Sequence, residues 1–315
     1  MIIYDEIIEM KTPTAVALGH FDGVHKGHQL VIGNAVKCKQ HNNLSPVVFT
    51  FRQNPACIVK NKKIPYLMDN DEKNQYISEL GAEYLFNIDF NVVKNISAEE
   101  FVRDVLYKKL KASRVYCGFN YHFGSGGTAN SETLRDLCSR YDMEVVALPP
   151  AMYNDEPISS TRVRHYLKQG RIADVTTMLG REYSYNLVVC KGNQLGRRMG
   201  TPTFNQVIPE HLILPRFGVY ATAVTLENGS KVCGVTNIGI KPTVGTDAPL
   251  AETWLPHYNC GELYGKKVRF DIIDFIRGEK KFHSIVELKA SILADGEKSL
   301  KIFHNYFGEK RTNKK

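Results

Sequence analysis

The sequence predicts an α/β protein of two domains: a doubly wound parallel sheet over residues 1–182, and an antiparallel β-barrel with a closing helix over residues 183–315. In the first half, strand-like apolar runs alternate with helix-like segments, which indicates βαβ units and a parallel sheet. In the second half, short runs rich in valine, tyrosine and threonine are separated by turns at roughly ten-residue spacing, which is typical of an antiparallel barrel. A chain of 315 residues is long enough to bury a core in each domain.

The elements of the first half follow one another as strand and helix. Apolar runs predict strands at Ala15–Leu18, Val47–Phe51, Tyr84–Ile88, Arg114–Cys117 and Glu144–Leu148. Spacing and start signals predict a helix that includes Leu30 to Val36, helices over Asp71–Leu80 and Ser131–Tyr141, and one from a capping-box pattern at Ser97 to about Lys111. In such a sheet the ligand binds beyond the carboxyl ends of the strands. The segments that follow the strands are therefore where a site is expected.

The character of the sequence changes after Gly180-Arg-Glu182, where we place the domain boundary. Strands are predicted at Tyr185–Cys190, Gly218–Leu226, Lys231–Asn237 and Lys267–Phe275. Asn228-Gly229, between two of these runs, is a strong hairpin signal. A closing helix is predicted over Ser284–Phe307, because its apolar residues lie near helical spacing.

Composition and charge limit the class of protein. No apolar run approaches the ~20 residues of a membrane span, and the N-terminus lacks the features of a signal peptide, so we expect a cytoplasmic protein with no membrane partner. Seven scattered cysteines without a C-x-x-C pattern indicate reduced thiols and argue against a zinc site. The net charge of +8 is dispersed apart from a basic tail, and no aromatic-basic RNA signature is present. We therefore expect attraction for polyanionic small molecules such as ATP and no stable nucleic-acid partner, and the oligomeric state stays open.

The segment G-H-F-D-G-V-H-K-G-H follows the first predicted strand. Gly19 and Gly23 are expected to take positive φ in a tight turn. His25 and His28 come at the start of the next helix, where unpaired N–H groups and the positive end of the helix dipole favour a phosphate. Imidazoles at i and i+3 can both face that phosphate, and Gly27 between them lets it approach the backbone. The alternative is that both histidines are ordinary helix-start or surface residues.

This segment resembles the HxGH signature of the nucleotidyltransferase superfamily, and its longer form resembles the adenylyltransferase module of bacterial bifunctional riboflavin kinase/FAD synthetases. The resemblance implies that the first domain transfers AMP from ATP to FMN, giving FAD and pyrophosphate. It implies that His25 and His28 are catalytic and stabilise charge on the α-phosphate. It also implies ATP-binding positions at Gly19, Phe21, Gly23 and Gly27.

Two further segments match the same family. Gly118-Phe-Asn-Tyr-His-Phe-Gly124 is similar to its G-x-[DN]-[FY]-x-F-G stretch, which implies that Asn120 faces the flavin and nucleotide pocket. Ile158-Ser-Ser-Thr-Arg-Val-Arg164 is similar to its I-S-S-T-x-[IV]-R motif and offers hydroxyls and guanidinium groups at another predicted helix N-terminus. By the resemblance, the phosphates that leave as pyrophosphate are held by Ser160, Thr161 and Arg164. Without the family, a glycine-rich loop and an ordinary helix cap would explain both segments.

The second half resembles the riboflavin kinase module of that family, which phosphorylates riboflavin to FMN with ATP. The stretch from Lys191 to Gly200 looks like its glycine-rich nucleotide flap, with ATP-binding positions at Gly192, Gly196 and Arg197. Pro202-Thr-Phe-Asn205 stands where the family has P-T-A-N, which implies that the oxygens of Thr203 and Asn205 hold Mg²⁺ with the nucleotide phosphates.

Later segments complete the likeness to the kinase. Glu252-Thr-Trp-Leu matches the segment that carries the general base, which implies that Glu252 takes the proton from the ribityl 5′-hydroxyl. The run from Val235 to Thr243 matches V-x-N-I-G-x-x-P-T. Arg277 with Lys281-Phe282 matches the R-x-E-x-K-F run near the flavin, which makes Arg277 a candidate flavin-binding residue.

The kinase motif departs from the family pattern at two positions. In G-T-P-T-F-N, Thr201 replaces an aromatic residue, and Phe204 replaces a small alanine beside the proposed metal ligands. Overpacking a tight site typically costs ~1–3 kcal/mol, which as lost positioning would be ~10–100-fold in rate. Two alternatives to the bifunctional enzyme therefore stay open. One is a monofunctional FAD synthetase whose barrel is a weak or inactive kinase that only binds flavin, and the other is a flavin-binding regulator with a basic surface for RNA.

Overall fold

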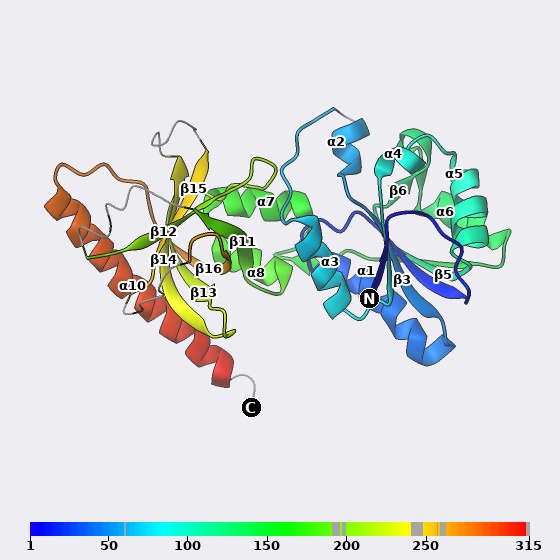
Figure 1. The fold of residues 1–315 in the computed structure, drawn as a ribbon. Coiled ribbons are helices and arrows are strands. Elements are labelled where there is room, and N and C mark those ends of the chain that lie inside the picture. The colour runs from blue at the N-terminus through cyan, green and yellow to red at the C-terminus, as the bar shows by residue number, and fades with distance from the viewer. Residues whose placement is uncertain are drawn as a thin grey trace. The chain divides into compact units, whose positions relative to one another are not determined.

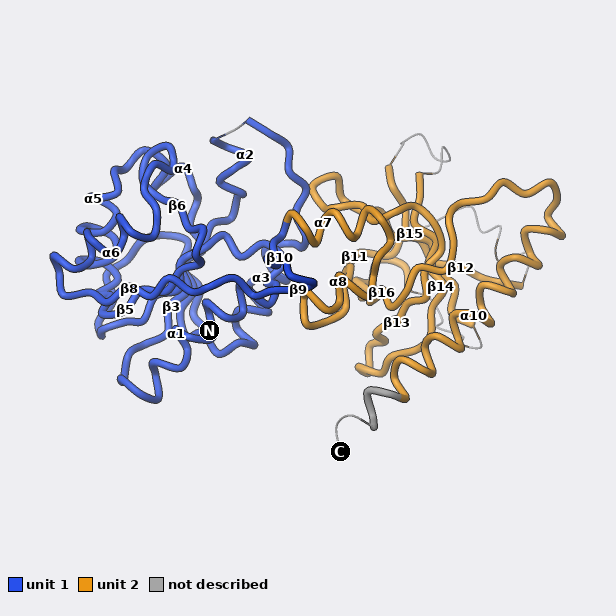
Figure 2. The backbone as a smooth tube through the Cα atoms, turned by 180° about the vertical axis from the view of Figure 1, so that it is seen from behind, with its two compact units in different colours: residues 1–160 blue, residues 161–315 orange. Residues whose placement is uncertain are grey.

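The computed structural model describes residues 1–59, 61–190, 196, 200–240, 248–256, 258 and 263–312, with side chains up to residue 308. The chain falls into two compact units, Met1–Ser160 and Thr161–Lys315, which Figure 2 draws in different colours. The domain boundary that the sequence places at Glu182 stays a prediction.

The first unit is built on a six-stranded sheet in which every strand pair is parallel, with the order β1-β4-β3-β2-β5-β8 (Figure 1). The strands are β1 (Ile2–Tyr4), β2 (Thr14–Leu18), β3 (Ser45–Phe51), β4 (Tyr84–Ile88), β5 (Ala112–Gly118) and β8 (Glu144–Leu148). The predicted parallel sheet is therefore confirmed. Strand β1 was not predicted, because an isolated run of three residues shows no period.

Helices cover both faces of this sheet. They are α1 (Lys26–Asn42), α2 (Pro55–Val59), α3 (Asn70–Glu79), α4 (Phe90–Val93), α5 (Ala98–Glu100), the π-helix η1 (Phe101–Lys109), the 3-10 turn η2 (Ser125–Gly127) and α6 (Ser131–Ser139). Alternate residues of β2 enter two different cores. Val16 and Leu18 pack with residues of η1 and α6, whereas Ala15 and Ala17 pack with residues of α1 and α3. Because both faces of these strands are buried, the strands appear in the sequence as continuous apolar runs.

The predicted helix that begins at Ser97 changes its geometry along its length. The capping box is present, because Ser97 Oγ accepts from the Glu100 amide at 3.1 Å and Glu100 Oε2 accepts from the Ser97 amide at 2.8 Å. The chain then continues as the π-helix η1, in which the Leu110 amide donates to the Val105 carbonyl. Wide turns of this kind are not specified by the apolar spacing that predicts a helix.

The carboxyl ends of β2 and β5 form the switch point of the sheet. Helix α1 carries the chain from β2 to β3 on one side of β2, and β5 lies on its other side. Two small antiparallel pairs accompany the loops: β6 (His122–Phe123) with β7 (Ala129–Asn130), and β9 (Met152–Tyr153) with β10 (Glu156–Pro157). Ligands of open α/β sheets bind at such a switch point. The segments after β2 and β5 are therefore well placed for a site.

The second unit contains a closed antiparallel barrel with the order β11-β12-β15-β14-β13-β16, as predicted. Its strands are β11 (Tyr183–Cys190), β12 (Thr203–Val207), β13 (Gly218–Thr225), β14 (Lys231–Ile240), β15 (Pro249–Trp254) and β16 (Lys267–Gly278). The hairpin predicted at Asn228-Gly229 joins β13 to β14, with Thr225 opposite Lys231. Strands β12 and β15 were not predicted.

Within the described ranges, the helices of the second unit are α7 (Ser160–Gln169), whose first residue belongs to the first unit, α8 (Ile172–Leu179) and α10 (Ile285–Thr312). The predicted closing helix is α10, which lies along β13, β14 and β16 (Figure 1). Its residues Ile302, Phe303 and Phe307 pack on Ala221, Ala223 and Ile273 of the barrel. No helix within the described ranges has the length and apolar character needed to cross a bilayer.

Six of the cysteines lie in the described ranges and are free thiols: Cys38, Cys57, Cys117, Cys138, Cys190 and Cys233. Cys260 lies outside the described residues. Burial raises the pKa of Cys117 to about 11 and that of Cys138 to about 12, so these two thiols stay protonated at neutral pH.

Candidate active sites

The turn between β2 and α1 has an unusual backbone. Gly23 takes φ +83° as predicted, but Phe21 and Val24 also lie at positive φ, 57° and 38°. The prediction of positive φ at Gly19 is wrong. Gly19 is needed for space instead, because a Cβ there would lie 2.7 Å from the ring of Phe21. Positive φ is strained in a non-glycine residue and worst in a β-branched one, so the surrounding contacts must hold this turn in place.

The two motif histidines stack on each other at the start of α1. Their ring centroids are 3.6 Å apart and the planes meet at 19°. His25 is the N-cap residue, and its Nδ1 accepts the backbone N–H of His28 at 3.3 Å. Because Nδ1 acts as an acceptor, neutral His25 carries its proton on Nε2. The prediction that both imidazoles share one face of the helix start is confirmed.

The N-terminus of α1 is suited to an anion. The first turn of this 17-residue helix contains no acidic residue, although acidic residues are usually favoured there. Gly27 lacks a Cβ that would lie 3.2 Å from the ring of His25 and 3.8 Å from the carbonyl oxygen of Ile158. A glycine here therefore leaves the backbone beside the His25 ring open to close approach.

The third motif reaches the same turn through Ser160. Its Oγ donates to the backbone carbonyl of Asp22 at 2.8 Å. The structure thus brings together His25, His28 and Ser160, which are separated by more than a hundred residues in the sequence. Thr161 and Arg164 continue α7 in the second unit, so their part in phosphate binding stays a proposal.

Asn120 lies in the loop after β5, next to β2 in the sheet. Its side chain is exposed, and the Tyr121 amide closes a turn onto the Gly118 carbonyl at 3.1 Å. The loop therefore emerges at the same switch point as the histidine turn. A flavin or nucleotide contact of Asn120 stays a proposal.

The sequence does not indicate that two charged residues, one in this turn and one in α3, are buried. Asp22 and Lys73 are each only 3% exposed. Burial lowers the pKa of Lys73 to about 8, and the negative charge of Asp22 acts in the opposite direction. Asp22 lies inside the matched motif. The sequence around Lys73 does not indicate burial, because a lysine next to acidic residues at a helix start is expected to be exposed to solvent.

Three polar residues lie in a row across the outer face of the barrel. Asn205 on β12 is directly opposite Glu252 on β15, which in turn is directly opposite Asn237 on β14. Directly opposed residues in an antiparallel pair share one face, with Cβ atoms about 4.5–5.5 Å apart. Thr203 is two residues before Asn205 on the same strand and lies on the same side. Asn237 lies within the V-x-N-I-G-x-x-P-T run, but the sequence alone does not identify it as a site residue.

Asn205 has the character of a cation ligand. The residue is 7% exposed, and among the described residues its Oδ1 has no hydrogen-bond partner. A buried amide oxygen without a partner is costly, and a hard cation such as Mg²⁺ is coordinated by oxygens of this kind. The exposed Thr203 adds a hydroxyl on the same face. The two proposed metal ligands therefore fit Mg²⁺ in chemistry.

Phe204 does not crowd these ligands, and that expectation was wrong. Successive side chains of a strand point to opposite faces, so Phe204 points away from the side that carries Thr203 and Asn205. Phe204 is 7% exposed and lies opposite Thr253, whose Oγ1 is 2.9 Å from Thr236 Oγ1 in the barrel interior. The phenyl ring is part of the barrel core.

Replacing Phe204 with alanine is therefore expected to change stability rather than metal use. Truncation of a buried phenylalanine typically costs about 3–5 kcal/mol in the free energy of unfolding. Urea unfolding of Phe204→Ala measures this loss, with Val207→Ala as the control because Val207 on the same strand is 42% exposed. An unchanged unfolding curve together with a changed Mg²⁺ requirement would restore the crowding interpretation.

Only part of the predicted nucleotide flap can be described. The Thr201 amide donates to the carbonyl of Gly196 at 2.9 Å, and Thr201 itself is 1% exposed. Gly192 and Arg197 lie outside the described residues, as do Lys241 to Thr243 at the end of the V-x-N-I-G-x-x-P-T run. Their ATP-binding roles stay predictions from the resemblance.

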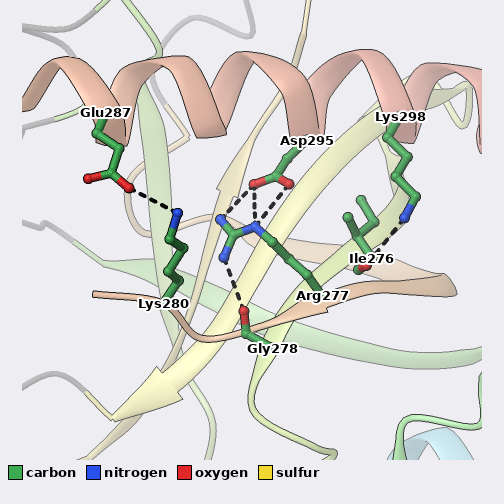
Figure 3. Close-up of polar contacts among 7 residues, drawn as sticks. All are labelled: Ile276, Arg277, Gly278, Lys280, Glu287, Asp295 and Lys298. Carbon is green, nitrogen blue, oxygen red and sulfur yellow. Dashed lines mark hydrogen bonds and ion pairs between the residues drawn. The ribbon is translucent and has the colours of Figure 1, made fainter. Parts of the chain in front are cut away.

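Arg277 is engaged by the closing helix. Its Nε and Nη2 donate to the carboxylate of Asp295 on α10 at 2.7–3.1 Å, and its Nη1 donates to the Gly278 carbonyl at 3.0 Å (Figure 3). Asp295 is 6% exposed. Lys280 and Glu287 form a second link between the end of β16 and α10, at 2.9 Å. The observed contacts of Arg277 fasten the strand end to the helix, and its contact with flavin stays a proposal.

Comparisons with known proteins cover both units. Residues 7–162 match the family model described as FAD synthetase, and residues 179–303 match the one described as riboflavin kinase. A protein named bifunctional riboflavin kinase/FMN adenylyltransferase from Buchnera aphidicola subsp. Schizaphis graminum is 31% identical over 304 residues, which cover 95% of this chain and 96% of that protein. A protein of the same name from Bacillus subtilis is 32% identical over 306 residues, which cover 95% of each chain.

A solved structure shows the same fold. The crystal structure of a protein from Streptococcus pneumoniae, named there as a macrolide-efflux protein, has a TM-score of 0.83 and 29% identity. The match covers 94% of this chain and 97% of that one. The likeness extends over nearly the whole of both proteins.

Proposed function

The chain belongs to the family of bifunctional riboflavin kinase/FMN adenylyltransferases, and we propose that it makes FAD from riboflavin in two ATP-dependent steps. The barrel phosphorylates riboflavin to FMN. The parallel-sheet domain then transfers AMP from ATP to FMN. The observation that carries this proposal is the stacked His25–His28 pair at the start of α1, at the switch point of the sheet and inside the region that matches FAD synthetase.

In the adenylyl transfer, a phosphate oxygen of FMN attacks the α-phosphorus of ATP, and the bond from that phosphorus to the bridging oxygen breaks. Pyrophosphate leaves with the electron pair. No side-chain nucleophile is needed, because catalysis rests on positioning and charge stabilisation. His25 offers a proton on Nε2 to a phosphate oxygen, His28 stacks beside it, and the N-terminus of α1 adds its dipole.

The remaining adenylyltransferase residues are assigned by resemblance. Gly19, Phe21, Gly23 and Gly27 shape the ATP-binding turn, and Asn120 faces the flavin. Ser160, Thr161 and Arg164 hold the leaving pyrophosphate. The hydrogen bond that Ser160 Oγ donates to the Asp22 carbonyl supports the nearness of this serine to the histidine turn. Because a serine has one O–H donor, this bond would have to open before the hydroxyl could donate to a phosphate.

In the kinase step, Glu252 takes the proton of the ribityl 5′-hydroxyl of riboflavin. The oxygen attacks the γ-phosphorus of ATP, and ADP leaves. The position of Glu252 between Asn205 and Asn237 supports this role. A general base next to Asn205, a proposed ligand of the Mg²⁺ that binds the ATP phosphates, is within reach of the reacting hydroxyl. Gly192, Gly196 and Arg197 bind the nucleotide by resemblance, and Arg277 lies toward the flavin.

Mg²⁺ would be held by Thr203 and Asn205, where it would neutralise charge on the phosphates of ATP. We expect Asn205→Leu to raise the Mg²⁺ concentration for half-maximal riboflavin phosphorylation by at least ~10-fold, because a ligand oxygen is lost. The adenylyl transfer should keep its Mg²⁺ dependence. Asn186→Leu on β11 is the control, because Asn186 is exposed on a neighbouring strand. An unchanged Mg²⁺ requirement in Asn205→Leu would exclude this residue as a ligand.

The monofunctional alternative loses one of the two observations that motivated it, since Phe204 points into the barrel core. The other, Thr201 in place of an aromatic residue, remains. Two incubations with ATP and Mg²⁺, followed by chromatography of the flavins, test the whole scheme. We expect FMN and FAD from riboflavin, and FAD from FMN. FAD from FMN with riboflavin untouched would leave only the adenylyltransferase, and no product in either incubation would contradict the proposed function. We expect both reactions to take place in the cytoplasm, which cell fractionation tests.

A further inference from the structure

The closing helix meets the proposed kinase site at a glycine. Gly296 is a buried residue in the interior of α10, where glycine is a poor helix former. A Cβ at this position would lie 2.5 Å from Cζ3 and 3.0 Å from Cη2 of Trp254. Both atoms belong to the outer edge of the indole ring. The missing side chain of Gly296 therefore leaves the space in which this ring packs against the helix.

Trp254 lies beside the residues proposed for the kinase reaction. It is the last residue of β15 and is directly opposite Thr203 on β12. Directly opposed residues share one face of the sheet, with Cβ atoms about 4.5–5.5 Å apart. Glu252 is two residues earlier on β15 and therefore points to the same face. Trp254 is thus a neighbour of a proposed Mg²⁺ ligand and of the proposed base.

Contacts on both sides of Gly296 hold the helix in place. The carboxylate of Asp295 accepts Nε and Nη2 of Arg277, at the end of β16, at 2.7–3.1 Å (Figure 3). Further along α10, Ser299 Oγ donates to the Gly234 carbonyl on β14 at 2.8 Å, and Ser299 is fully buried. A group added at Gly296 would therefore displace the edge of the indole more readily than the helix backbone.

The displacement would be large enough to affect the reaction. Carbon atoms in ordinary contact are about 3.5–4.0 Å apart, so a methyl group at Gly296 requires the ring of Trp254 to move by about 1 Å. Misplacement of this size near a reacting centre can cost about 100-fold in rate. The ring is the cross-strand neighbour of Thr203, so its displacement changes the packing around that hydroxyl.

We propose that Trp254 is a positioning residue for riboflavin phosphorylation: its indole packs in the space left by Gly296 of α10 and holds Thr203 in place for Mg²⁺. The proposal rests on the proposed function, because it names a residue that supports the same site. Trp254 does not touch the substrate in this scheme. It acts through Thr203.

The test uses full-length variants and the fluorescence of Trp254, which is the only tryptophan of the chain. Gly296→Ala adds one methyl group, and we expect it to raise the Mg²⁺ concentration for half-maximal FMN formation by at least ~10-fold. In protein without Mg²⁺ or nucleotide, the same variant should change the emission maximum of Trp254 and its quenching by acrylamide. FAD formation from added FMN should be unchanged, which reports that the protein is folded.

Gly308→Ala is the matched control. Gly308 lies in the same helix, and among the described residues outside its own stretch of helix no heavy atom would lie within 4 Å of a Cβ there. This variant adds the same methyl group to α10 without crowding the indole. We expect it to show the Mg²⁺ requirement and the tryptophan emission of the wild type.

A double variant separates the position of the ring from the loss of the glycine. Phenylalanine lacks the outer atoms of the indole that face Gly296, so Trp254→Phe makes room for the alanine methyl group. We expect Gly296→Ala/Trp254→Phe to recover at least ~3-fold of the rise in Mg²⁺ requirement caused by Gly296→Ala. If Gly296→Ala does not fold, Trp254→Phe alone tests the ring, and we expect it to raise the Mg²⁺ requirement by at least ~3-fold.

The outcomes distinguish this inference from the function it rests on. Wild-type protein that forms no FMN would contradict the proposed function. Wild-type protein that forms FMN, together with an unchanged Mg²⁺ requirement in Gly296→Ala, would overturn the role of Trp254. A raised requirement would also overturn it if the emission and quenching of Trp254 stayed the same, or if the double variant recovered nothing, because the ring would then not transmit the change.

Discussion

In His28→Ala we expect the rate of FAD formation from FMN to fall by about 10²–10³-fold, because the substitution removes one of the two groups that we propose to stabilise charge on the α-phosphate. The substitution removes the imidazole ring and keeps the helix cap. The cap is the hydrogen bond from the backbone N–H of residue 28 to His25 Nδ1, and alanine retains that N–H. The ring of His28 stacks on that of His25 and meets Phe21 edge-on at 5.3 Å, so its loss affects the β2–α1 turn and the start of α1.

Riboflavin phosphorylation by the same His28→Ala chain should remain at the wild-type rate, since the proposed kinase residues lie on the barrel. Initial rates of both reactions on one preparation measure the contrast. His41→Ala is the control, because His41 is an exposed histidine in the last turn of the same helix. A folded His28→Ala protein that lost both activities, or kept both, would show that the two-site assignment is incorrect.

Glu252→Gln is expected to reverse the pattern. Glutamine keeps the size of the side chain and its place opposite Asn205 and Asn237, but it cannot accept the proton of the ribityl hydroxyl. Loss of a positioned general base typically costs 10²–10⁴-fold in rate, so we expect a fall of about that size in FMN formation. FAD formation from added FMN should not change.

The measurement for Glu252→Gln is the initial rate of each step, with saturating ATP and Mg²⁺. Glu227→Gln is the control, because Glu227 lies in the exposed β13–β14 hairpin and forms an ion pair with Lys266 at the surface, at 2.7 Å. If Glu252→Gln phosphorylates riboflavin at the wild-type rate, Glu252 is not the base. A loss confined to FAD formation would place Glu252 in the wrong reaction.

The sequence predicts most of the fold because most strands have simple patterns. The strands of the parallel sheet are apolar on both faces, so β3, β4 and β8 stand out as short apolar runs. Strands β12 and β15 were missed for the opposite reason. They carry Thr203, Asn205 and Glu252, the polar residues of the proposed kinase site, so the alternation of apolar and polar residues is weak at the positions where the proposed function requires oxygen atoms.

The adenylyltransferase site was predictable where its residues form a motif. The helix start at His25, the shared face of His25 and His28 and the closeness of Ser160 follow from local chemistry and from the resemblance. The burial of Asp22 and Lys73 does not, because it depends on how the sheet and its helices pack in the folded domain. The two residues are 51 positions apart in the chain, and no local sequence pattern indicates that both will be buried.

The two errors at the site have a common cause. The positive φ expected at Gly19 lies instead at Phe21 and Val24, and the bulk of Phe204 lies in the barrel core instead of beside Asn205. In both cases the residue type was interpreted correctly. The backbone angle at Gly19 and the face of the strand on which Phe204 lies were not. Direction is set by the backbone path and by the alternation of a strand, which residue identity alone does not fix.

In the proposed scheme, one chain uses two different phosphorus atoms of ATP at two sites. The most direct test incubates the protein with riboflavin and Mg²⁺ and with ATP labelled at either the α- or the γ-phosphorus, and then separates the flavins. We predict that γ-label appears in FMN and in FAD, and that α-label appears in FAD and never in FMN. FAD without α-label, or FMN without γ-label, would contradict the account.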